Sequence, residues 1–167
     1  NTSPKSISQI IKYNLDVVVY NFRMLDALIS KKEPITIHLK FNCGMNRFGF
    51  SENDIPKIKK DLNNNKIIVR SICSHLSCSR MPDKDNITNN ELRKFNNIVS
   101  KFPKNILAHV LNTSGVIRFP QHQYSAIRLG IGLYGIHDEE KLVQIGKLTT
   151  TISQVRSLKK DEIIGYG

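Results

Sequence analysis

Residues able to bind anions or transfer protons gather in a few short runs of this 167-residue chain. In residues 38–50, Lys40 ends a stretch of alternating apolar and polar residues, and a glycine-flanked loop then presents Arg47. The guanidinium group is planar and binds a carboxylate or phenolate through paired hydrogen bonds. A solvent-exposed loop with a surface lysine would give the same run, so this signal alone is weak.

A second run, residues 73–78, contains Cys73, His75 and Cys78. Cys73 and His75 share one face of an expected strand, so a zinc site is one interpretation. Zinc needs a fourth ligand, and none stands at a useful spacing. A buried thiol beside a polar histidine at a strand end explains the run better, and we expect no metal.

The third run, residues 109–115, passes from His109 into the hydroxyl-bearing Thr113 and Ser114. Backbone N–H groups and hydroxyls at the start of a helix form a cradle for phosphate. Simple capping of the helix by either hydroxyl explains the residues equally well.

The fourth run, residues 127–135, places Arg128 just before a series of glycines. An arginine within a buried strand must find a partner, because burying it unpaired is costly. The glycines would let a ligand approach the backbone, although a glycine-rich run is weak evidence by itself.

Extended apolar stretches alternate with amphipathic ones and position these runs. Such alternation predicts parallel βαβ units in an α/β fold, with polar residues at the carboxyl ends of strands, where α/β barrels bind ligands. A closed barrel needs about eight strands and about 250 residues, so we expect a partial TIM (β/α)8 barrel with about the last five strands. The expected strands are residues 15–20, 35–41, 67–74, 105–111 and 126–131, and the expected helices are residues 21–30, 51–62, 88–101 and 113–118.

The pattern changes after Gly146. Residues 148–158 alternate in the manner of a β-strand, residues 159–162 are typical of a turn, and residues 163–167 are again strand-like. We therefore expect residues 1–140 to be the barrel part and residues 141–167 to begin a C-terminal β domain.

Composition excludes several classes of protein. Hydrophobic residues make up 40% and charged residues 23%, which is typical of a globular domain, and no apolar run approaches the length of a membrane span. The net charge is +11, but the lysines are scattered among asparagines, which predicts no nucleic-acid partner. A basic nucleic-acid-binding domain is the alternative, and its affinity for nucleic acid would fall steeply as the salt concentration rises.

Three cysteines without the spacing of a disulfide framework are typical of a protein of the cytoplasm. The chain opens at Asn1, which indicates a segment of a longer protein.

In order and spacing, these runs together resemble bacterial alanine racemase, a family of pyridoxal-phosphate enzymes with a barrel and a C-terminal β domain. The resemblance covers nearly the whole chain. It implies a homodimeric, cytoplasmic enzyme that interconverts L-alanine and D-alanine by two-base proton transfer and supplies D-alanine for peptidoglycan. The runs that carry it read HLKFNCGMNRFGF, RSICSHLSCS, HVLNTSG, IRLGIGLYG and IIGYG.

The resemblance also implies residue roles. Lys40 matches a lysine that is often carbamylated and that orients Arg47. Arg47 matches the contact to the substrate carboxylate and to the phenolic oxygen of the cofactor. His75 matches a histidine packed against the cofactor ring, and His109 matches the histidine that hydrogen-bonds the arginine corresponding to Arg128.

Further positions match the cofactor and proton-transfer groups. Thr113, Gly130 and Ile131 match the phosphate-binding positions, and Arg128 matches the arginine that faces the pyridine nitrogen. Because arginine donates hydrogen bonds but does not readily deliver a proton, the ring stays a weak electron sink, which suits proton removal and return without side reactions. Tyr166 matches the catalytic tyrosine that is contributed across the homodimer.

The chain departs from the family pattern in ways that matter. Asn42-Cys43 stands where Asp-Thr is common, which loosens the expected support of Arg47. The lysine that forms the cofactor Schiff base belongs to the first barrel strand, and this chain matches from about the fourth, so we expect the 167-residue segment alone to be inactive. A racemase for another small amino acid and a non-catalytic pyridoxal-phosphate-binding barrel are the alternatives; the strand pattern of residues 148–167 disfavours the barrel.

Overall fold

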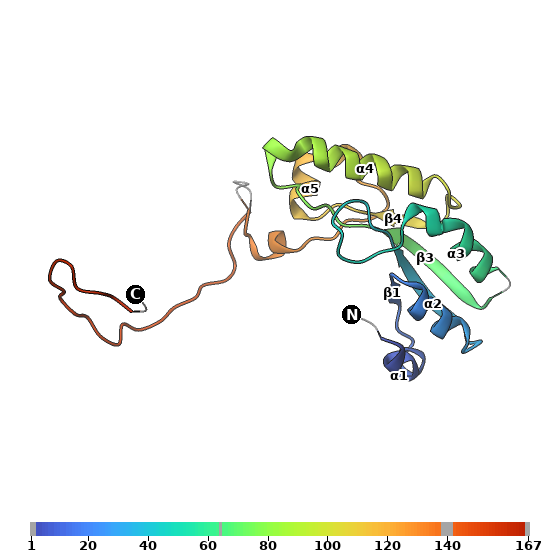
Figure 1. The fold of residues 1–167 in the computed structure, drawn as a ribbon, viewed down its shortest axis with the longest axis horizontal. Helices are drawn as coiled ribbons and strands as arrows, with labels where there is room; N and C mark the ends of the chain where they lie inside the picture. Colours follow the sequence, from blue (N-terminus) through green and yellow to red (C-terminus); the bar gives the residue numbers. More distant parts are fainter. Residues whose placement is uncertain (1–2, 64, 138–141, 166–167) are drawn as a thin grey trace.

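A four-stranded parallel sheet with strand order β1-β2-β3-β4 organises the chain in a computed structural model that describes residues 3–63, 65–137 and 142–165 (Figure 1). Each strand pairs with the one before it in sequence, and helices make the crossovers. The expected α/β alternation is confirmed. The strands are β1 (Val17–Val19), β2 (Ile35–Lys40), β3 (Ile67–Cys73) and β4 (Leu107–His109), and the main helices are α1 (Ile7–Lys12), α2 (Phe22–Ile29), α3 (Ile55–Leu62), α4 (Asp85–Val99) and α5 (Thr113–Arg118).

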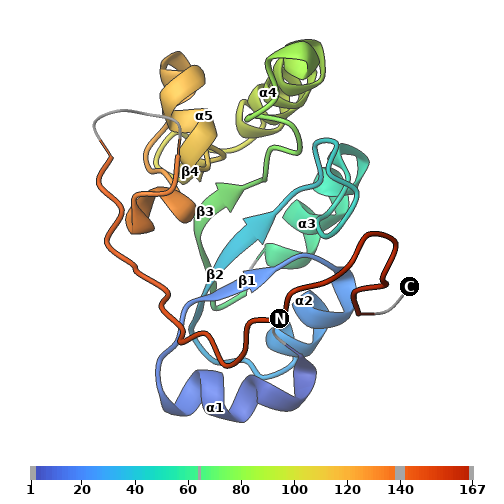
Figure 2. The same cartoon turned by 90° about the vertical axis from the view of Figure 1, so that its left-hand side faces the viewer.

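Helices α2, α3, α4 and α5 are arrayed along one face of the sheet (Figures 1 and 2). On β2 the residues that face them are apolar, and Ile37 and Leu39 are fully buried. Helix α2 begins where the side chain of Asn21 accepts a hydrogen bond from the Met24 N–H, and α2 buries Met24 and Leu28 against the sheet. This layer is the hydrophobic core, and it leaves the opposite face for polar groups.

A β-bulge in β3 sets which side chains reach that opposite face. Val69 pairs with Ile37, but Ser71, two residues on, pairs with His38, the next residue of β2. The bulge inserts Arg70 as an extra residue and shifts the alternation by one position. Ser71 and Cys73 consequently lie in register with the polar residues of β2 instead of facing the helices.

Helix α1 is an element that the sequence interpretation did not include. Ile7 and Ile10 are buried, at the i, i+3 spacing of an amphipathic helix. Ile10 lines a hollow beside Val17 at the β1 edge of the sheet. The spacing was readable from the sequence, but the helix is short.

The prediction of a strand at residues 126–131 is wrong. This segment runs beside β4, with hydrogen bonds from Ser125 N–H to the Ala108 carbonyl and from Arg128 N–H to the Leu111 carbonyl. The Ser125 hydroxyl accepts from the Ala108 N–H, the donor that a neighbouring strand would otherwise bond. The regular ladder is therefore replaced by local contacts, and the described residues form four strands.

The C-terminal segment, residues 142–165, extends away from the sheet (Figure 1). The expected turn is present, with Glu162 N–H bonded to the Lys159 carbonyl. The expected antiparallel strands are not found in the described part of this segment, where Leu148, Ile152 and Val155 are 100%, 81% and 82% exposed. A strand needs a partner edge, and none of the described residues supplies one here.

Among the described residues, every helix is too short or too polar to cross a membrane.

Candidate active site

Arg128 is the residue on which the polar groups at the carboxyl ends of the strands converge. Its guanidinium donates to Nδ1 of His109 at 2.5 Å and to Nδ1 of His75 at 3.2 Å. It also donates to the backbone carbonyls of Ser74, His109 and Val110. Burial lowers the pKa of Arg128. These carbonyls and ring nitrogens supply the partners that the half-buried guanidinium needs.

The two histidines bonded to Arg128 are neutral acceptors. Burial, and after it the adjacent charge of Arg128, lowers the pKa of His75 and of His109 from 6.5 to about 4. Because arginine is a donor only, each Nδ1 must present a lone pair to it. The structure thus brings together three of the site residues that the sequence predicted.

Lys40 lies at the end of β2 with a pKa lowered mainly by burial; Cys73 opposes the shift, and Arg128 and Arg47 add to it. No carboxylate among the described residues lies within ion-pair distance of this ammonium group. Lys40, Arg47 and His75 line one small pocket. The structure therefore brings Lys40 and Arg47 to the same pocket.

The loop that carries Arg47 is organised by Asn42. The Asn42 side chain accepts hydrogen bonds from the N–H groups of Gly44 and Asn46 and donates to the Asn46 side chain. Gly49 has φ +134°, and a Cβ there would lie 2.5 Å from the Asn42 nitrogen. Asn42 supports the turn of the loop and makes no described hydrogen bond to Arg47.

Thr113, the first residue of α5, faces the glycine-rich run. Its hydroxyl oxygen accepts from the N–H groups of Gly130 and Gly132, both at 3.1 Å. A Cβ on Gly132 would lie 2.7 Å from the Thr113 methyl carbon. Ile131 lies between these donors and begins the 3₁₀ turn η5 (Ile131–Tyr134). The predicted phosphate-binding positions therefore lie next to one another.

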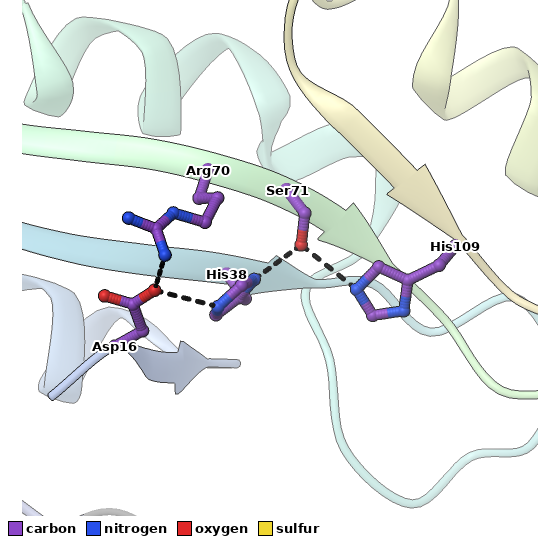
Figure 3. Close-up of polar contacts among 5 residues, drawn as sticks. All are labelled: Asp16, His38, Arg70, Ser71 and His109. Carbon is purple, nitrogen blue, oxygen red and sulfur yellow. Dashed lines mark hydrogen bonds and ion pairs between the residues drawn. The ribbon is translucent and has the colours of Figure 1, made fainter. Parts of the chain in front are cut away.

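A hydrogen-bonded row that the sequence analysis missed crosses the open face of the sheet (Figure 3). Nε2 of His109 lies 3.1 Å from the Ser71 hydroxyl, which lies 2.6 Å from Nδ1 of His38. Nε2 of His38 is 3.8 Å from the carboxylate of Asp16, which also pairs with Arg70. Alternation along β2 could have predicted that His38 shares a face with Lys40. The face of Ser71 could not be predicted in this way, because the bulge in β3 shifts the alternation by one residue.

Tyr166 lies outside the described residues. Within the described ranges, no group of three or more His, Cys, Asp and Glu side chains is arranged to hold a metal ion. Cys43 and Cys73 are buried and Cys78 is half-buried, each as a free thiol.

An arginine, a lysine and two histidines thus gather at the carboxyl ends of the strands of a parallel α/β sheet, which is the end where such folds usually bind their ligands. The family model for "Alanine racemase, N-terminal domain" matches residues 1–138. The chain belongs to the alanine racemase family.

Individual relatives agree with this assignment. The chain is 31% identical over 162 residues to an alanine racemase of Fusobacterium nucleatum, covering 93% of this chain and 46% of the relative. It is 29% identical over 169 residues to one of Shewanella amazonensis, with coverages of 95% and 46%. It is also 28% identical over 180 residues to an amino-acid racemase of Enterococcus faecalis, with coverages of 99% and 26%. The chain thus spans less than half the length of these curated relatives.

The fold is shared with solved alanine racemases. The structure from E. faecalis matches with a TM-score of 0.75 at 22% identity, over 86% of this chain and 41% of that one. The structure from Corynebacterium glutamicum matches with a TM-score of 0.73 at 21% identity, over 87% and 43%.

Proposed function

We propose that this chain is part of an alanine racemase and supplies the groups that hold pyridoxal phosphate and the substrate carboxylate. The observation that carries the proposal is the half-buried Arg128, held by neutral His75 and His109 at the carboxyl ends of the strands. In this proposal the four strands belong to a partial TIM barrel, and residues 141–167 begin a C-terminal β domain.

The donor set fits the cofactor. The Thr113 hydroxyl accepts from two backbone N–H groups, and no described residue accepts its own proton, so it is available to a phosphate oxygen. The N–H group of Ile131 would add to this cradle, and the N–H group of Gly130 would exchange its hydrogen bond to Thr113 for one to the phosphate. His75 would pack against the pyridine ring, and Arg128 would face the ring nitrogen.

When bound, pyridoxal phosphate would be an electron sink, because it would accept the electron pair that remains on the substrate Cα after its proton is removed. Arg128 donates a hydrogen bond without giving up its proton, so it limits the depth of that sink. Arg47 binds the substrate carboxylate and fixes the orientation of the substrate. Lys40, once converted to an anion by carbamylation, would orient Arg47 through an ion pair.

Proton transfer is assigned to two groups on opposite sides of the substrate. Tyr166 would be one of these groups, contributed across a cytoplasmic homodimer. The other would be the lysine that forms the cofactor Schiff base, which the resemblance places on the first barrel strand, before the part of the family that this chain matches. A phenol ordinarily has a pKa near 10, so Tyr166 needs a cationic neighbour to act as a base. The product would be D-alanine for peptidoglycan, and the 167-residue chain alone would be inactive.

The test uses the complete protein that carries this chain, loaded with pyridoxal phosphate. We expect interconversion of L-alanine and D-alanine, followed by circular dichroism. Arg128→Gln should lower kcat by at least about tenfold, whereas Arg93→Gln on the exposed face of α4 should not. A loaded protein without any racemisation of alanine would overturn the proposal.

The similarity to an amino-acid racemase favours one second candidate, a racemase for another small amino acid. Comparing kcat/KM for alanine with that for serine discriminates the two. A higher value for serine would favour the second candidate.

A further inference from the structure

We infer that Asp16, His38 and Ser71 are positioning residues that fix the proton of His109 on Nε2 and thereby hold Arg128 in place. The inference rests on the proposed function, in which Arg128 faces the cofactor ring. Its basis is the hydrogen-bonded row in Figure 3, which links β4 to the residue preceding β1.

The direction of each hydrogen bond follows from the donors and acceptors available. Arg128 has no acceptor, so Nδ1 of His109 must be the acceptor in their 2.5 Å contact. Neutral His109 then carries its proton on Nε2, which donates to the Ser71 hydroxyl at 3.1 Å. The Ser71 proton has one remaining described partner, Nδ1 of His38 at 2.6 Å.

The far end of the row carries a negative charge. With Nδ1 accepting from Ser71, His38 presents its Nε2–H toward the Asp16 carboxylate, 3.8 Å away. Arg70 pairs with the same carboxylate and keeps it in position. Every donor in the row therefore points from Arg128 toward Asp16, and reversing any one bond would place two donors or two acceptors face to face.

The position of Ser71 is what makes the row possible. Ser71 is 1% exposed, and the bulge at Arg70 turns it onto the face of His38. Without its hydroxyl, Nε2 of His109 would lose its described acceptor, and the alternative tautomer would direct an N–H at Arg128. Loss of the row should therefore release Arg128 as well as cost stability.

The first experiment reads the tautomer directly, independently of cofactor and activity. The complete protein is labelled with ¹⁵N-histidine, and the His109 signals are assigned by their loss in His109→Gln. We expect a protonated Nε2 and an unprotonated Nδ1, and we expect Ser71→Ala to shift this balance. Ser71→Thr, which keeps a hydroxyl, should restore it. A His109 protonated on Nδ1, or unchanged in Ser71→Ala, would overturn the inference.

The second experiment separates positioning from stability. Ser79→Ala removes another buried serine hydroxyl, which bonds Asn112 at 2.8 Å away from the row. Both alanine variants should lower Tm, but Ser71→Ala alone should lower kcat for alanine by about tenfold. Ser71→Ala alone should also raise the fraction of turnovers in which alanine passes its amino group to pyridoxal phosphate, which gives pyruvate and pyridoxamine phosphate in equal amounts. If both variants changed only Tm, Ser71 would be structural; if the wild-type protein did not racemise alanine, the proposed function would fail while the tautomer test would still decide the inference.

Discussion

Charge is distributed unevenly at the scale of single residues. Lys40, Arg47 and Arg128 lie near one another, and the two histidines beside Arg128 stay neutral. Sequence reasoning singled out each of these residues from its run, and the family resemblance then implied its role. It could not predict that burial suppresses the histidine charges, because burial depends on strands far apart in sequence.

The neutral histidines predict a pH dependence of stability. His75 and His109 have pKa values of about 4 when folded and 6.5 ordinarily, so the unfolded chain binds protons between these values that the folded chain does not. The free energy of unfolding should therefore fall as pH decreases from 6.5 toward about 4 and be insensitive to these groups above that range. Urea unfolding of the complete protein at successive pH values measures this. His109→Gln should flatten the decline, His122→Gln should not, and equal slopes would contradict the prediction.

Lys40 carries a second prediction at this scale. Its lowered pKa increases the fraction of neutral amine, which attacks carbon dioxide, forms an N–C bond and loses a proton to leave an anionic carbamate. The anion would be stabilised by Arg47 and Arg128. ¹³C NMR of the complete protein in labelled bicarbonate should show one carbamate signal that Lys40→Arg removes. A spectrum without that signal at neutral pH would exclude the modification.

At the scale of elements, extended apolar stretches predicted the strands that became β1 to β4, and in β2 every second residue is buried. This pattern failed where local contacts replace the ladder, as at Ser125, and where a bulge shifts the alternation, as at Arg70. The row through Ser71 was missed for the second reason.

The close approach of Gly132, within η5, to Thr113 predicts an effect on cofactor affinity. In Gly132→Ala the new methyl would lie 2.7 Å from the Thr113 methyl carbon and push the hydroxyl from its donors. The affinity for pyridoxal phosphate should fall by about tenfold, which corresponds to roughly 1.4 kcal/mol. Gly146→Ala, which meets no atom within 4 Å, is the control in the same fluorescence titration. Equal affinities for the two variants would remove Thr113 from the phosphate site.

For the whole molecule, the exposed apolar groups matter most. The C-terminal segment exposes Leu148, Ile152 and Val155, and β1 leaves one edge without a described partner. In the complete protein we propose that further barrel strands and the β domain cover these surfaces.

The 167-residue chain expressed alone should therefore aggregate. An unpaired strand edge beside exposed apolar side chains is a template for association. Size-exclusion chromatography with light scattering should show heterogeneous assemblies, whereas the complete protein should elute as a single dimer. A monodisperse monomer that melts cooperatively would show that these surfaces do not need a partner.

The sequential strand order has a consequence for synthesis on the ribosome. Each strand from β2 onward pairs with the strand translated immediately before it, so its docking site already exists when it emerges. No strand within the described sheet has to wait for a later one, which lets the sheet grow in the direction of translation. The row of Figure 3 would be completed in the same order, with Asp16 first and His109 last.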